Sequence, residues 1–167
     1  MILFAPHNDD EALFASYTIM RHKPLVVVVY DSYVQDWCTK EERRKETEQA
    51  MELLGAKVIF LGLDDRECDY KKTKKEMTGF SSDVIFAPSG SHKHHELVGR
   101  IAKELWNNPI IYTTYNGNEY LVKGSITITP TEEEKELKNK ALDCYKTQLG
   151  KNAPHFEAVR NQPEYYE

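Results

Sequence analysis

The chain has 167 residues, the length of one ordinary domain, so we expect a single α/β domain over residues 1–167. Hydrophobic residues make up 40% and charged residues 29%, which is the balance of a globular protein with its own core. The net charge is −5 and Lys and Arg are not concentrated in one segment. This composition argues against nucleic acid as a partner, because the basic surface that holds phosphates is missing.

The cysteines and the apolar runs bear on compartment. Cys38, Cys68 and Cys144 are odd in number and far apart, so neither a disulfide framework nor a zinc ribbon is expected. No apolar run approaches the ~20 residues of a membrane span. The chain reaches Asp9 and Asp10 before any run long enough for a signal peptide. We therefore expect a cytoplasmic protein without a membrane partner, in a reducing compartment.

The first third of the chain alternates between strand and helix patterns. The unbroken run Val26 to Val29 is typical of a strand that is buried on both faces. Thr47, Ala50 and Leu54 recur on one helical stripe, and Gly55 supplies a stop signal. In chain order we expect strands over 2–5, 25–30 and 57–61, with helices over 11–21 and 39–54 between them.

The pattern is less regular after residue 61. The polar segment 62–80 has no clear assignment, and neither has the stretch after residue 149. Thr131 precedes three glutamates, which predicts a helix start with Thr131 as its cap. Between these segments we expect strands over 84–87 and 110–115, an edge strand within 121–128, and helices over 95–106 and 131–149.

This order predicts a single-domain, Rossmann-like fold: a mostly parallel sheet with helices on both faces. In such folds ligands bind beyond the carboxyl ends of the strands, where the strand order reverses. For the order 3-2-1-4-5, the first and fourth strands are neighbours at that reversal. The loops after Ala5 and Ala87 are therefore expected to face each other.

These two loops contain the unusual residues. Residues 6–11 read Pro-His-Asn-Asp-Asp-Glu and residues 91–96 read Ser-His-Lys-His-His-Glu, so they hold four of the six histidines. Imidazole and carboxylate groups together are ligands for zinc, and a catalytic zinc keeps about three of them. Taken singly, the acidic residues are also compatible with a helix start and the histidines with an exposed polar loop. The first loop has no glycine and two carboxylates, which argues against a dinucleotide pyrophosphate there.

Three segments resemble the PIG-L/LmbE-like family of N-acetylglucosaminyl deacetylases. Residues 5–11 are similar to that family's His-Pro-Asp-Asp-Glu signature. Residues 43–46, followed by Leu54 and Gly55, are similar to its helix with Arg and Glu three residues apart. Residues 92–95, followed by Gly99, are similar to its His-x-Asp-His segment. The match in order and spacing runs from residue 2 to about 105, with a weaker tail to residue 149.

The resemblance implies a role for each matched residue. His7, Asp10 and His95 would be the ligands of one zinc ion per chain. Asp9 would be the general base, and His92 would stabilise the oxyanion and protonate the leaving amine. The implied reaction is zinc-dependent removal of an acetyl group from an N-acetylated amino sugar or sugar conjugate, a small-molecule substrate.

Residues next to this set divide into matches and departures. Arg43 would contact the substrate, with Arg44 as an alternative and an ion pair with Glu46 as the purely structural interpretation. Glu46 and His94 would support the groups that touch metal and substrate. Asn8 replaces the family's Pro, which a turn tolerates. His94 replaces the family's Asp, so the group beside the catalytic His92 is changed.

The sequence leaves the substrate and the activity less defined. A polar, aromatic loop at 115–120 follows the fifth strand, so Tyr115 and Asn116 are candidates for the substrate site, with Trp37 and His155 as weaker ones. Two other functions stay open: a non-catalytic sugar- or nucleotide-binding module of the same fold, and a metal-dependent hydrolase of non-sugar N-acyl amines. The oligomeric state does not follow from the sequence.

Overall fold

The computed structural model describes residues 1–31, 37–117 and 119–167. Its strands are β1 (Ile2–Ala5), β2 (Leu25–Asp31), β3 (Lys57–Asp64), β4 (Ile85–Pro88), β5 (Ile110–Tyr112), β6 (Ile126–Ile128) and β7 (Glu164–Tyr166). Its helices are α1 (Asp10–Phe14), α2 (Ser16–His22), α3 (Lys40–Leu54), α4 (Tyr70–Thr78), α5 (Lys93–Leu105), α6 (Glu132–Leu142) and α7 (Lys146–Val159).

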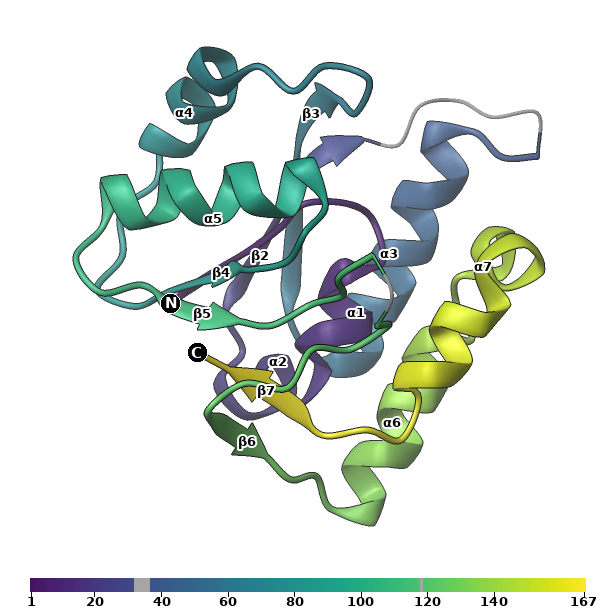
Figure 1. The fold of residues 1–167 in the computed structure, drawn as a ribbon. Coiled ribbons are helices and arrows are strands. Elements are labelled where there is room, and N and C mark those ends of the chain that lie inside the picture. Colours follow the sequence, from purple (N-terminus) through teal and green to yellow (C-terminus); the bar gives the residue numbers. More distant parts are fainter. Residues whose placement is uncertain (32–36, 118) are drawn as a thin grey trace.

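The strands form one mostly parallel sheet in the order β3-β2-β1-β4-β5-β7-β6 (Figure 1). The first five are parallel to one another, and β7 and β6 extend the sheet in antiparallel pairing. The predicted order of the five parallel strands is confirmed. The expected edge strand is also present, because β6 lies at one edge of the sheet.

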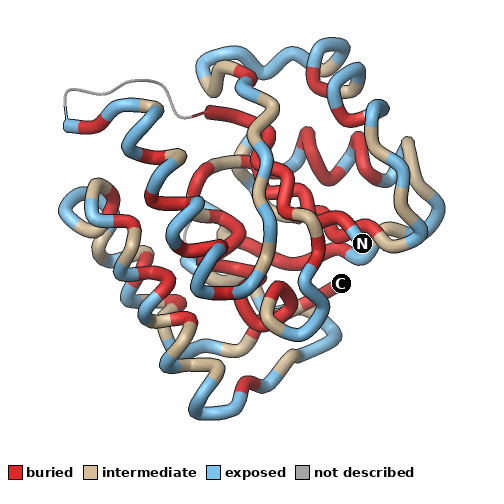
Figure 2. Tube along the Cα trace, turned by 180° about the vertical axis from the view of Figure 1, so that it is seen from behind, coloured by how far each residue is buried: buried red, intermediate tan, exposed pale blue. Residues whose placement is uncertain are grey.

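Helices cover both faces of the sheet, and each face has its own core. Leu3, Ala5, Val26 and Val28 pack with residues of α1, α3, α6 and α7 on one face. The alternate residues, among them Phe4, pack with residues of α4 and α5 on the other face. Figure 2 shows the consequence as a continuous buried centre beneath an exposed outer layer. A strand between two helical layers needs apolar side chains at every position, which explains the unbroken run in β2.

The predicted helix signals hold in α3 and α6. Thr39 and Glu42 form a reciprocal capping box at the start of α3, and Thr131 and Glu134 form another at α6. Gly55 ends α3 with a φ of 74°, a left-handed conformation that glycine adopts without strain.

Several elements differ from expectation. The helix expected over 11–21 is two short helices that break at Ala15, and the helix expected over 131–149 ends at Leu142 before α7 begins. The unassigned segments contain α4, most of α7 and β7. Glu164 lies in β7, and its carboxylate accepts hydrogen bonds from the backbone N–H groups of Tyr17 and Thr18 at 2.6 and 3.0 Å. These bonds tie β7 to α2.

Close packing brings α5 directly against β4. A Cβ atom on Gly99 would lie 2.2 Å from the carbonyl oxygen of Pro88, so only glycine permits this approach. The helix begins at Lys93, two residues before the predicted start. His92 caps it, and His94 and His95 lie in its first turn. The helix therefore carries these imidazoles to the carboxyl end of the sheet.

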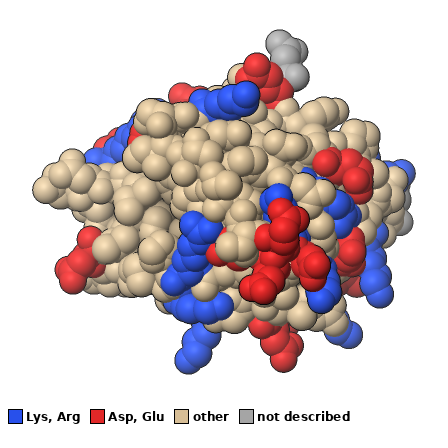
Figure 3. Space-filling view, turned by 90° about the horizontal axis from the view of Figure 1, so that it is seen from below, with Lys and Arg blue, Asp and Glu red and all other residues tan. Residues whose placement is uncertain are grey.

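Charges of both signs are mixed on the surface seen in Figure 3, where Lys and Arg side chains alternate with Asp and Glu. Within the described part of the chain, the helices are all too short or too polar to cross a bilayer.

Candidate metal centre and adjoining pocket

The loops that follow β1 and β4 meet at one edge of the sheet, as the strand order predicts. His7 lies in the loop after β1, and His95 lies in the first turn of α5. Their rings lie 5.5 Å apart between centroids, with the carboxylate of Asp10 between them. His7, Asp10 and His95 each place one potential ligand atom within 4.8 Å of the other two.

The Oδ2 atom of Asp10 is the centre of this cluster. It lies 3.0 Å from His7 Nδ1 and 3.0 Å from His95 Nε2, and it accepts a hydrogen bond of 2.9 Å from the His7 backbone. Burial would raise the pKa of Asp10, but the charge of His95 and the hydrogen bonds from both histidines outweigh it. The pKa of Asp10 is therefore held well below its usual range, and the carboxylate stays ionised.

The tautomer of His95 follows from its second neighbour. The hydroxyl of Thr114 donates to the carbonyl of Ser89, so its oxygen must accept from His95 Nδ1, 2.8 Å away. In a neutral ring the proton is then on Nδ1, and Nε2 carries the lone pair. This Nε2 atom is buried and lies 3.0 Å from Asp10 Oδ2, to which a protonated ring donates. In the neutral ring that binds a metal, two acceptors face each other across this distance.

A divalent cation resolves this arrangement. Two buried acceptors at 3.0 Å repel each other unless positive charge lies between them. Ligand atoms about 2.0–2.1 Å from a tetrahedral zinc ion are about 3.3 Å from one another, close to the two spacings at Asp10. Two imidazoles and one carboxylate also form a donor set that suits zinc and leaves room for water. The residues present therefore fit a metal.

Asp9 lies beside the cluster in a strained backbone conformation. Its φ is 121°, a region that costs a non-glycine residue about 1–3 kcal/mol. Arg43 reaches it from α3: the guanidinium donates to Asp9 Oδ2 at 3.0 Å and to the carbonyl of Asn8. Burial raises the pKa of Asp9 to about 8 although Arg43 opposes this effect. The carboxylate is thus held in one place and has high proton affinity.

Glu11 stabilises the same turn through hydrogen bonds. Its carboxylate accepts from the Asp9 backbone at 3.2 Å and from the hydroxyl of Tyr145. Burial raises the pKa of Glu11 to about 7, while the Tyr145 hydrogen bond opposes the rise. Because Glu11 is fully buried, it supports the loop and does not reach the pocket.

The two remaining histidines of the second loop lie close to His7. The ring of His92 is 5.1 Å from that of His7 and 5.5 Å from that of His95. Burial, with the nearby charges of His7 and His95, lowers the pKa of His92 to about 4. His94 Nδ1 lies 2.7 Å from His7 Nε2, and its ring stacks on Tyr30 at 4.3 Å. The group that replaces the family's Asp therefore has its closest polar contact with His7, although its backbone N–H also faces His92 Nδ1 at 3.4 Å.

A pocket of about 370 Å³ opens beside this cluster. One side is formed by His7, Asp9, Asp10 and Arg43. The sequence candidates Trp37, Tyr115 and His155 also line it, together with Leu13, Asp65, Gln148, Lys151, Asn152 and Phe156. Trp37 is 39% exposed, so it is a pocket residue and not part of the core.

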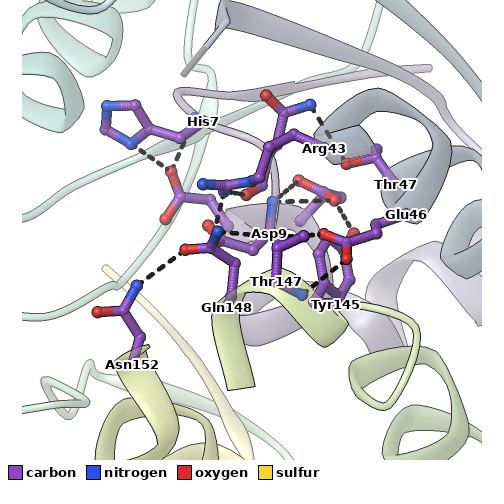
Figure 4. Close-up of polar contacts among 12 residues, drawn as sticks. His7, Asp9, Arg43, Glu46, Thr47, Tyr145, Thr147, Gln148 and Asn152 are labelled. Carbon is purple, nitrogen blue, oxygen red and sulfur yellow. Dashed lines mark hydrogen bonds and ion pairs between the residues drawn. The ribbon is translucent and has the colours of Figure 1, made fainter. Parts of the chain in front are cut away.

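The wall contributed by α7 was not foreseen from the sequence. Gln148 and Asn152 lie one turn apart on this helix, and the Asn152 amide donates to Gln148 Oε1 at 2.9 Å (Figure 4). Glu46 of α3 accepts from the backbone and hydroxyl of Thr147 at 2.8 and 2.7 Å, which ties the start of α7 to the site. The polar residues at spacing four within 148–155 are the one signal that points to this face.

Two candidates lie elsewhere. Arg44, the alternative to Arg43, pairs with Asp31 at the end of β2 and is not among the residues that line the pocket. Asn116 pairs with Glu119 in an isolated β-bridge and is likewise not among the lining residues. Asn118, which belongs to the same predicted loop, is outside the described residues.

Comparison with known proteins relates this arrangement to others. The sequence model described as PIG-L: GlcNAc-PI de-N-acetylase matches residues 2–106, which include every member of the cluster. No curated protein matches the sequence.

Solved structures of similar fold include functionally different proteins. The conserved protein TT1542 from Thermus thermophilus is 20% identical, with a TM-score of 0.74 over 99% of this chain and 92% of that one. A triple mutant of a deacetylase of the teicoplanin biosynthetic pathway is 15% identical, with a TM-score of 0.74 over 99% and 96%. GalB, the 4-carboxy-2-hydroxymuconate hydratase from Pseudomonas putida, is 13% identical, with a TM-score of 0.63 over 99% and 94%. These similarities concern the fold.

Proposed function

Because this chain belongs to the PIG-L family of de-N-acetylases, we propose that it is a zinc-dependent hydrolase that removes the acetyl group from an N-acetylated amino sugar. The observation that carries the proposal is the set of His7, Asp10 and His95, whose potential ligand atoms lie within 4.8 Å of one another beside a polar pocket. In this proposal His7, Asp10 and His95 hold one divalent metal ion.

The metal would lower the pKa of a water molecule toward ~7 and polarise the amide carbonyl. Asp9 would take a proton from that water as the water oxygen attacks the acetamide carbon. Its position supports this role, because the carboxylate lines the pocket and Arg43 holds one oxygen at 3.0 Å. Arg43 also keeps the buried carboxylate closer to its ionised form, which a base requires.

His92 would protonate the leaving nitrogen as the carbon–nitrogen bond breaks, so that acetate and a free amine leave. The imidazole is half-buried and lies near both ligand histidines. In its protonated form it would also donate to the oxyanion of the tetrahedral intermediate. The proton that Asp9 gains from water balances the one that His92 gives to the amine.

The pocket supports a sugar as the substrate. Trp37 and Tyr115 offer aromatic surface for the apolar face of a pyranose ring, and Gln148 and Asn152 offer amides for its hydroxyl groups. Arg43 would contact the acetamide end, next to Asp9. The volume of about 370 Å³ lies within the usual range for small-molecule sites and suits a modest-sized sugar or conjugate.

A screen for acetate release tests the proposal. The protein loaded with one zinc ion per chain is incubated with N-acetylated hexosamines and their conjugates, and in parallel with N-acetylated amines that contain no sugar. We expect acetate from the sugar set and loss of that activity after chelation. Release from the non-sugar set alone would assign a different amide hydrolase, and no release from either set in a protein with one zinc ion per chain would contradict catalysis.

A further inference from the structure

His7 presents its two ring nitrogens to two different sets of potential ligands. Nδ1 lies 3.0 Å from Asp10 Oδ2, within the set already described. Nε2 lies 2.7 Å from His94 Nδ1, on the opposite edge of the ring. His7, His92 and His94 place one ligand atom each within 4.8 Å of one another. This second set consists of imidazoles alone.

The second set is held by packing that does not depend on the first. The ring of His94 is buried and stacks on Tyr30 at 4.3 Å between centroids. The hydroxyl of Tyr30 is held in turn by Thr73 Oγ1 at 2.7 Å. His92 lies at the start of α5, and its ring centroid is 5.0 Å from that of His94.

We infer that His7, His92 and His94 form a second binding site for a borderline-soft divalent cation such as Zn²⁺, with His7 bridging it to the first. Three neutral imidazoles are a donor set that suits zinc, copper, nickel and cobalt ions. His7 Nε2 and His94 Nδ1 are closer than the about 3.3 Å between ligands of one zinc ion, so binding needs a small separation of the rings.

The chemistry of the bridge predicts a proton count. With one ion on Nδ1, the neutral His7 ring carries its proton on Nε2 and donates it to His94 Nδ1. A second ion at Nε2 forms a metal–nitrogen bond in place of the N–H bond. The proton passes to the buffer, and the ring becomes a bridging imidazolate. The second ion should therefore release one proton more than coordination by neutral imidazoles alone.

The bridge also has a consequence that rests on the proposed function. An ion bound to a ring nitrogen of His92 occupies the lone pair that must be protonated before His92 can act as the acid. The second ion should therefore inhibit the deacetylase that the first ion activates. The metal count described next does not depend on this activity, so the second site and the proposed reaction can fail independently.

The test is zinc stoichiometry at buffered free zinc concentrations, measured by equilibrium dialysis and elemental analysis on the chelator-stripped full chain. We expect the parental protein to bind two zinc ions per chain. His94→Phe keeps a ring on Tyr30 but has no nitrogen, and it should bind one. His95→Ala should also bind one, and His22→Ala, which changes an exposed histidine far from the cluster, should bind two.

Calorimetry in buffers of different ionisation enthalpy then counts the protons released with the second ion. A thermal melt of each variant confirms that it is folded. A parental chain that binds one zinc ion at saturation, or a folded His94→Phe protein that still binds two, would overturn the second site.

Discussion

Thr114 Oγ1 lies 2.8 Å from His95 Nδ1, and the same hydroxyl donates its proton to the carbonyl of Ser89. One threonine thus decides which nitrogen of a buried histidine is free. Gly90 permits this contact, since a Cβ atom there would lie 2.2 Å from Thr114 Oγ1. The close packing of the segments that follow β4 and β5 therefore fixes which nitrogen of the neutral His95 ring faces the candidate metal centre.

The first prediction follows from that bond. Thr114→Val keeps the shape but removes the acceptor, so His95 loses the partner that orients it. We expect zinc affinity to fall about 10–100-fold, the usual cost of losing such a partner. The measurement is the zinc dissociation constant by chelator competition. Thr114→Ser, which retains the oxygen, should bind zinc as the parent does, and equal affinity in the Val variant would contradict the role of Thr114.

The second prediction concerns Asp9. Asn tolerates a positive φ better than most residues, so Asp9→Asn should fold and bind zinc as the parent does. Loss of the general base should lower kcat/KM for acetate release about 10²–10⁴-fold. Asp65→Asn changes another carboxylate of the same pocket and serves as the control, with near-parental turnover expected. Near-parental turnover in a zinc-replete Asp9→Asn protein would exclude Asp9 as the base.

How far the sequence predicts this site depends on where each residue lies relative to the sheet. Val26 to Val29 indicate a doubly buried strand, and the alternation of strands with helices predicts a Rossmann-like sheet, for which we take the order 3-2-1-4-5. The order alone brought His7 and His95 together. Their convergence needs only chain topology, because the carboxyl ends of neighbouring parallel strands always share an edge.

The wall formed by α7 needs information that the local sequence does not contain. Pro154 lies inside this helix and Asn152 has non-helical φ and ψ angles, so its periodicity is broken. Gln148 is buried, and the start of α7 is tied to α3 by the contact between Thr147 and Glu46, which are about a hundred positions apart in the sequence. The contact of His94 with His7 was missed for a related reason: the family comparison suggested a partner for His92, whereas packing on Tyr30 directs the ring to His7.

The third prediction tests the wall of α7. Asn152 is exposed and lines the pocket, so its amide is available to a sugar hydroxyl. Asn152→Ala should raise KM about 3–10-fold, the value of roughly one hydrogen bond, with kcat unchanged because the contact is uniform along the reaction. Glu157→Gln, on the same helix but outside the residues that line the pocket, is the control. An unchanged KM for the best sugar substrate would remove α7 from the binding site.

The last prediction concerns His94, which replaces the family's Asp. A general acid acts while protonated, so activity falls as the pH rises through the pKa of His92. Burial and the charges of His7 and His95 lower that pKa to about 4, and His94 supplies no negative charge to oppose them. His94→Asp would place a carboxylate beside His92, stabilise the imidazolium and raise its pKa. The alkaline limb of kcat/KM should therefore move to higher pH, each unit corresponding to about 1.4 kcal/mol.

The experiment compares pH profiles of the parent, His94→Asp and His94→Asn, each loaded with one zinc ion per chain. His94→Asn changes the size of the side chain without adding charge, so its alkaline limb should stay with that of the parent. The contact between His94 Nδ1 and His7 Nε2 gives the opposing expectation. If His94 acts only through His7, both substitutions should change zinc affinity equally and leave the alkaline limb of kcat/KM unchanged. Superimposable profiles for the parent and His94→Asp would therefore assign His94 to His7 and separate it from the acid.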